Sequence, residues 1–145
     1  MIPLVLAVAT GVVGVTGWLW WRGDGELRRG SGERLRPSEV ALPDDAFGPV
    51  ATMLLFGSQQ DERTGVVRDR LADLIDGLDG VRIAEVDLTA RGDLAGRYAV
   101  TRTPSVFALD GDGRLRSRVK GTGSVETLHA ALDTALPRRA DPTDR

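Results

Sequence analysis

Residues 101–120 read TRTPSVFALDGDGRLRSRVK and carry the clearest local signal in this chain of 145 residues. The apolar stretch 105–109 and the stretch 114–120 are each of strand length. The segment 110–113 between them, Asp-Gly-Asp-Gly, is typical of a tight turn. The sequence therefore predicts two antiparallel strands joined as a β-hairpin.

Two further segments upstream indicate strands that alternate with a helix. The run 50–56 (VATMLLF) is almost entirely apolar, as in a strand buried on both faces, and 81–88 (VRIAEVDL) alternates enough for a second strand. Between residues 66 and 78, apolar side chains recur at helical spacing, which predicts an amphipathic helix ending near Gly80. A strand, a helix and a strand in this order imply a right-handed parallel crossover.

The rest of this region completes an α/β domain. A short helix is expected at 93–98, and Ser124 is expected to cap a last helix that Pro137 closes. The apolar face of this last helix holds Val125, Leu128, Leu132 and Ala135. The order β-α-β-α-β-β-α predicts a four-stranded mixed sheet covered by helices, over residues 50–137.

Residues 1–21 form a segment long enough to cross a membrane. After Met1 it holds no charged side chain for 20 positions, and a helix of that length spans about 30 Å. Trp18, Trp20 and Trp21 stand at its end, and Arg22 follows, as expected at the headgroup region. We therefore predict a transmembrane helix. A cleaved signal peptide is the alternative, although neither a basic start nor a small-residue cleavage site is clear.

Charge and composition beyond this segment indicate topology and linkage. No Lys or Arg precedes the predicted helix, and five arginines follow it between residues 22 and 36. The positive-inside rule then places the C-terminal domain in the cytoplasm of a single-pass cell-membrane protein. Residues 22–49 are rich in Gly, Arg, Pro and acidic residues without periodicity, which predicts a flexible linker. Residues 138–145 are expected to be a disordered tail.

Missing residue types exclude several chemistries. The chain has no cysteine, which rules out disulfides, cysteine-based metal sites and thiol redox chemistry of its own. The single histidine, His129, is expected at or near the surface. Nineteen basic against 21 acidic residues leave no positive excess for nucleic-acid binding. The segment 110–113 lacks the further ligands of a calcium loop, and no nucleotide-binding glycine motif occurs. We therefore expect no metal and no cofactor.

The chain resembles the thioredoxin family, in particular the membrane-anchored thioredoxin-like proteins of actinobacteria, from about residue 50 to residue 136. The resemblance rests on MLLF before a long helix, VDLT, GRYAV, TRTPSVFALDGDG and GTGSVETLHAAL. The most specific of these is TRTPSVF, because the family's cis-proline opens a strand there and Thr103-Pro104 match it. The resemblance implies a thioredoxin-like fold.

The resemblance also implies where the family's chemistry would lie. Counted from Phe56, the two positions of the family's Cys-x-x-Cys motif fall on Asp61 and Thr64, and the family's buried acid falls on Leu55. The field of a helix N-terminus, which favours a thiolate in the family, would here favour the carboxylate of Asp61. We therefore expect Asp61 to be an N-cap with a lowered pKa, and the chain not to be an enzyme.

The groove beside the cis-proline needs no cysteine, since in the family the backbone there pairs with an extended peptide. Thr103 and Pro104 are therefore candidate peptide-binding residues. Alternatively, Pro104 is kept only because the fold needs the turn. We expect a redox-inactive module that binds or scaffolds a protein or peptide partner at the lipid bilayer.

Two other functions remain open. One is an accessory subunit of a thiol-disulfide redox or cytochrome-maturation system whose partner supplies the cysteines. The other is a domain that organises the membrane helix into a weak homodimer, for which Gly11, Gly14 and Gly17 would allow close approach.

Overall fold

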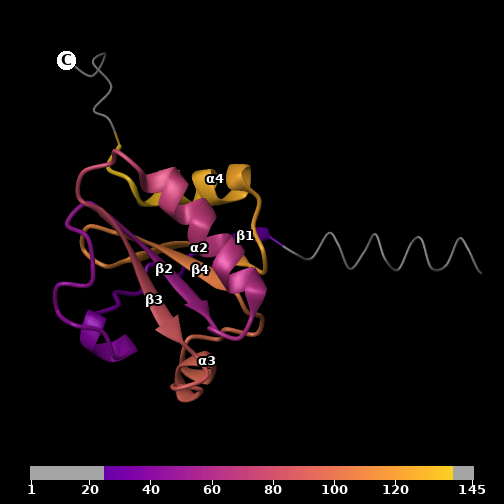
Figure 1. Ribbon diagram of the computed structural model, residues 1–145. Helices are drawn as coiled ribbons and strands as arrows, with labels where there is room; N and C mark the ends of the chain where they lie inside the picture. Colours follow the sequence, from indigo (N-terminus) through magenta and orange to yellow (C-terminus); the bar gives the residue numbers. More distant parts are fainter. Residues whose placement is uncertain (1–24, 139–145) are drawn as a thin grey trace, which may run out of the picture.

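The computed structural model describes residues 25–138. They form one mixed sheet with the strand order β1-β5-β4-β2-β3 (Figure 1). Of the neighbouring strand pairs in this sheet, β2–β3 is parallel and the other three are antiparallel. The strands are β1 (Glu26–Arg29), β2 (Ala51–Gly57), β3 (Val81–Asp87), β4 (Ser105–Asp110) and β5 (Leu115–Lys120). The predicted hairpin, β4–β5, is confirmed, as is the parallel crossover from β2 to β3.

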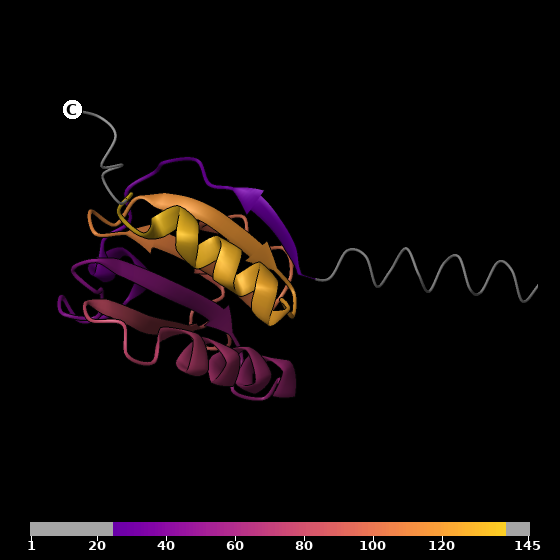
Figure 2. The same ribbon diagram turned by 90° about the horizontal axis from the view of Figure 1, so that it is seen from above.

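Helices cover both faces of the sheet. On one face lie α2 (Glu62–Ile75) and α4 (Val125–Ala135), and Figure 2 shows both from above. The other face is covered by η1 (Pro37–Val40) and α3 (Asp93–Arg97). All seven residues of β2 are buried, as its apolar sequence predicts, because it lies inside the sheet and under both layers.

Two apolar clusters fill the space between these layers. The first joins α2 and α4 to the sheet through side chains such as Leu71, Leu128 and Met53. The second lies on the opposite face, where the rings of Phe56 and Phe107 are 4.6 Å apart. The apolar faces of α2 and α4 are thus buried against one face of the sheet.

Two predictions are wrong. Over residues 25–138 the sheet has five strands rather than four, and the segment predicted as a linker over 22–49 is folded from residue 25 onward. Residues 25–49 belong to the folded domain: β1 adds a fifth strand beside β5, and Leu35 and Val40 are 2% and 1% exposed in the second cluster. All four side chains of β1 are exposed, so its sequence carries no apolar periodicity. Backbone hydrogen bonds to β5 place it at the sheet edge.

The predicted transmembrane helix over 1–21, including its glycines, lies outside the described residues. Within residues 25–138, no helix is long and apolar enough to span a membrane. The predicted tail also lies outside them, apart from Arg138.

Candidate functional site

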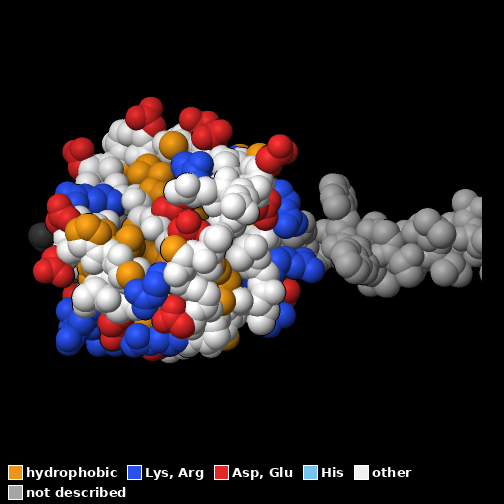
Figure 3. Space-filling model, turned by 60° about the horizontal axis from the view of Figure 1, so that its bottom comes forward, with side chains coloured by type: hydrophobic (Ala, Val, Ile, Leu, Met, Phe, Trp, Pro, Cys, Tyr) orange, Lys and Arg blue, Asp and Glu red, His pale blue; other side chains and the backbone are white. Residues whose placement is uncertain are grey.

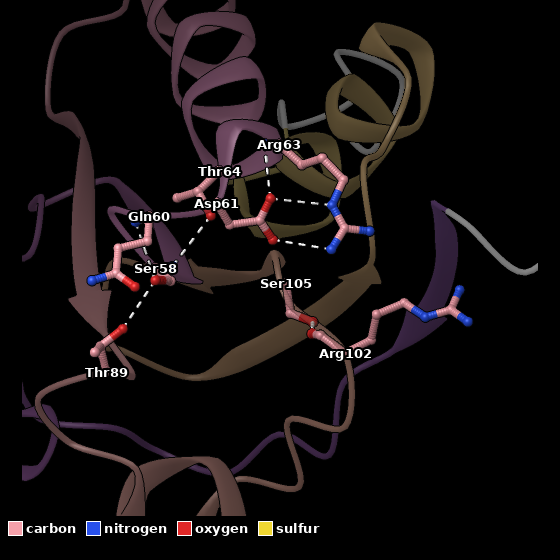
Figure 4. Close-up of polar contacts among 8 residues, drawn as sticks. All are labelled: Ser58, Gln60, Asp61, Arg63, Thr64, Thr89, Arg102 and Ser105. Atoms are coloured by element: carbon pink, nitrogen blue, oxygen red, sulfur yellow. Dashed lines mark hydrogen bonds and ion pairs between the residues drawn. The ribbon is translucent and has the colours of Figure 1, made fainter.

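Asp61 is the N-cap of α2, as the sequence predicts. Its carboxylate accepts a hydrogen bond from the backbone N–H of Arg63 at 3.0 Å and is also held by the Arg63 guanidinium, at 3.2 and 3.0 Å (Figure 4). The hydrogen bond from the Arg63 side chain, together with the one from its backbone, lowers the pKa of the Asp61 carboxyl. An ionised carboxylate held by three hydrogen bonds is a poor general base at neutral pH.

Thr64 is fully buried in the first turn of α2. Its hydroxyl accepts a hydrogen bond from the backbone N–H of Ser58 at 3.2 Å. A Cβ at Gly57 would collide with the Thr64 side chain, so β2 ends against it. Thr64, at the second position that the resemblance assigns to a cysteine, therefore has a structural role: its hydroxyl holds the loop between β2 and α2.

Leu55 occupies the position that the resemblance assigns to a buried acid. The side chain is completely buried in the first apolar cluster, on the face of β2 that α2 and α4 cover. An apolar group cannot relay a proton, so this position offers no help to a nucleophile at the start of α2.

The Thr103-Pro104 peptide bond is cis, as the resemblance implies. Pro104 is buried, and its carbonyl accepts a hydrogen bond from the backbone N–H of Gly121 at 2.8 Å. The next residue, Ser105, is the register partner of Phe56 on β2. The cis-proline turn consequently lies beside the loop that leads into α2, and Figure 4 shows Ser105 and Arg102 opposite the Asp61–Arg63 pair.

Thr103 has an unpaired backbone. The residue is partly exposed, and neither its N–H nor its C=O forms a hydrogen bond with any residue in the described range 25–138. A residue with both groups unpaired beside a strand can accept an added strand. This is the property that the peptide-binding prediction requires of it.

Two surface features lie at the end of the sheet where this turn is found. An open pocket of about 310 Å³ is lined by Glu26, Thr101, Arg102 and Lys120. On the α2 and α4 side, Val66 and Val125 are 42% and 51% exposed.

The two helices meet near these valines. Arg70, one turn after Val66, donates a hydrogen bond from Nη1 to the carbonyl of Gly123 at 2.6 Å. Gly123 is two residues before Val125, so both apolar side chains lie close to the junction of the helices. The two valines are therefore exposed apolar side chains at the end of the helical layer where α2 and α4 begin.

Ser58 and Thr89 form a contact that sequence reasoning missed. Their hydroxyl oxygens are 2.9 Å apart and join the loop after β2 to the loop after β3 (Figure 4). The only signal available was that each hydroxyl follows a strand of one parallel pair, whose carboxyl ends meet at the same sheet edge.

The other motifs have structural roles. The Asp110 carboxylate accepts hydrogen bonds from the backbone N–H groups of Asp112 and Arg114 and binds the Arg116 guanidinium, as in a hairpin turn. His129 is exposed, and its Nδ1 lies 3.2 Å from Oδ2 of Asp133, one helical turn further along α4. Among residues 25–138, no three potential ligands are close enough to hold a metal ion.

Several solved structures with a similar architecture are thioredoxins. A mutant thioredoxin from Halobacterium salinarum superposes with a TM-score of 0.53 at 13% identity, over 62% of this chain and 78% of that one. Thioredoxin from Fasciola hepatica gives 0.51 at 17% identity, over 61% and 83%. Oxidised mitochondrial thioredoxin 3 from Saccharomyces cerevisiae gives 0.50 at 20% identity, over 57% and 76%.

The sequence itself matches no protein-family model and no curated protein. Identities of 13 to 20% establish a likeness of fold. The chain therefore has a thioredoxin-like fold and contains no cysteine with which to exchange thiols and disulfides.

Proposed function

We propose that this protein is a membrane-anchored thioredoxin-like module, similar to those of actinobacteria, that binds an extended segment of a partner protein without thiol chemistry. The observation that carries the proposal is the unpaired backbone of Thr103 beside the cis-proline turn. Strand addition at this backbone does not require Asp61 or Thr64, which have structural roles.

The binding mode is strand addition. An extended peptide would pair its backbone N–H and C=O with those of Thr103, and its side chains would reach the exposed Val66 and Val125. Each added hydrogen bond contributes about 0.5–1.5 kcal/mol, so we expect weak and reversible binding unless the apolar contacts are good.

A backbone-modified peptide tests this mode sharply. Peptides would be selected from a random library on the full chain in detergent, and their affinity measured by fluorescence anisotropy. N-methylation of the backbone nitrogen that pairs with Thr103 should weaken binding by up to about tenfold, the loss expected for one hydrogen bond. N-methylation of the next residue, which faces away from the groove, is the matched control. Equal effects of the two modifications, or no selected peptide, would refute the proposal.

Anchoring by residues 1–21, with the domain in the cytoplasm, is part of the proposal. It is supported by 20 uncharged positions followed by a cluster of arginines. Alkaline extraction of membranes should leave the chain in the pellet, and protease added to intact spheroplasts should spare the domain. Release by alkali would indicate a cleaved leader. Digestion of the domain by external protease would show that it lies outside the cytoplasm, contrary to the proposal.

The same groove would serve an accessory subunit whose partner supplies the cysteines. Trapping experiments distinguish the two roles, because such a partner would carry a cysteine pair in or next to the bound segment. A bound segment without cysteine favours the binding module.

A further inference from the structure

β1 brings the start of the domain to the candidate groove. Glu26 of β1 pairs with Lys120 of β5, and Lys120 pairs with Ser105 of β4. Ser105 in turn pairs with Phe56, near the end of β2. These residues form one row across the sheet, at the end where the cis-proline turn and the start of α2 lie.

Gly25 lies against the loop that follows β5. A Cβ at Gly25 would be 3.1 Å from the Cα of Gly123 and 3.3 Å from the carbonyl oxygen of Thr122. The same loop begins at Gly121, which is hydrogen-bonded to Pro104. One short loop therefore separates the first described residue from the candidate groove.

The distance to the predicted anchor is also short. Only residues 22–24 lie between Trp21, the last residue of the predicted transmembrane helix, and Gly25. Four Cα–Cα steps cover at most about 14 Å. A groove next to Gly25 cannot move far from the membrane surface.

We propose that the groove faces the bilayer and takes an extended juxtamembrane segment of an integral membrane protein. This inference rests on the proposed function and on the predicted anchor. A short tether raises the effective concentration of the groove for partner segments that lie at the same distance from the bilayer. Partner segments far from the bilayer are out of its reach. The partner is therefore restricted by its distance from the membrane as well as by its sequence.

The surface between the groove and β1 adds a charge preference. Lys120 lines the 310 Å³ pocket, and the acidic residue of the lining, Glu26, already forms an ion pair with Arg28 at 3.3 Å. Figure 3 shows Lys and Arg side chains at the edge of the domain where the described chain begins. We therefore expect an acidic residue in the partner segment, next to the residue that pairs with Thr103.

The orientation is tested with single engineered cysteines, which are unique labels in this chain. Thr101→Cys lies at the groove end, and Asp112→Cys lies in the hairpin turn at the opposite end; both sites are exposed. Each full-length variant carries an environment-sensitive fluorophore, in vesicles of phosphatidylcholine and phosphatidylglycerol that contain headgroup nitroxide lipid. Quenching at 101 and little at 112 is the expected result. Equal quenching, stronger quenching at 112, or failure of the chain to insert would overturn the proposal. None of these results bears on peptide affinity in detergent, so the orientation can fail while peptide binding stands. Failure to insert would count against the proposed anchor as well.

The partner is tested by crosslinking in cells that make the full chain. A photoreactive amino acid replaces Thr101, and a second chain carries in addition about 20 Gly and Ser residues before Gly25, which adds roughly 25 Å of reach. We expect crosslinks to an acidic segment adjacent to the membrane span of another protein, and their loss in the lengthened chain. Crosslinks to a soluble protein, to a second copy or to lipid alone, or crosslinks unchanged by lengthening, would overturn the inference.

Discussion

Arg63 donates three hydrogen bonds to the carboxylate of Asp61, one from its backbone N–H and two from its guanidinium. The backbone bond caps α2, and the two side-chain bonds hold both carboxylate oxygens. The same carboxylate stands where the resemblance assigns a reactive cysteine. A position that would carry a nucleophile thus stabilises the start of a helix.

We predict that Asp61 contributes to stability at neutral pH and loses that contribution in acid. Its pKa is lower in the folded chain than the ordinary value of 3.8, so its contribution is complete above that value and declines as the pH falls through the folded pKa. Denaturant unfolding of the full chain from pH 7 to pH 2 measures this. Asp61→Asn should flatten the acid decline while keeping part of the cap, whereas a decline identical to that of the wild type would contradict the assignment.

We predict that the chain does not reduce insulin disulfides and that Asp61→Cys with Thr64→Cys introduces measurable activity. The cysteine at 61 would sit at the N-terminus of α2, whose dipole favours the thiolate. Leu55 leaves the pair without an acid to assist, so the rate of insulin reduction should rise further when Leu55→Asp is added and folded protein is assayed. Thr64→Cys alone is the matched control. A wild-type rate above buffer would contradict the proposed function.

We predict that Leu35 belongs to the domain core and Leu27 does not. Leu35 is 2% exposed and Leu27 is 39% exposed, although both lie in the segment expected to be a linker. Leu35→Ala should cost about 2–5 kcal/mol of unfolding free energy, and Leu27→Ala no more than about 0.5 kcal/mol. Equal losses in denaturant titrations would mean that residues 25–49 do not pack as described.

We predict that a side chain is more destabilising at Gly25 than at Gly32. Both have positive φ, at +81° and +77°, but a Cβ at Gly25 meets Gly123 whereas one at Gly32 has open space. Gly25→Ala should therefore be destabilised by both backbone strain and contact, and Gly32→Ala by strain alone, about 1 kcal/mol. Hydrogen exchange at β1 reports the difference directly, and equal protection in the two variants would argue against the contact.

Local signals made most of the fold predictable. The hairpin, the buried β2 and the caps at Asp61 and Ser124 each depend on a few neighbouring residues. β1 depends on its pairing with β5, about 90 residues later, and its exposed side chains leave no pattern to read.

The candidate site divides in the same way. Asp61 could be identified because capping is local, and Thr103-Pro104 because the motif is short. The contact between Ser58 and Thr89 joins residues 31 apart and requires the sheet to be known. The closeness of Gly25 to the groove could not be predicted either, because it results from the pairing of β1 with β5.

The two ends of the described chain suggest how to attach a reporter. β1 starts at the groove end of the sheet, whereas α4 finishes beside Asp112 and the hairpin turn at the other end. A fluorescent protein fused beyond α4 would be attached at the end of the sheet opposite Thr103, so we expect the surface beside Thr103 to stay unobstructed. Fusion at the amino terminus would separate the domain from whatever residues 1–21 attach it to, so C-terminal tagging is the arrangement suited to imaging this protein in living cells.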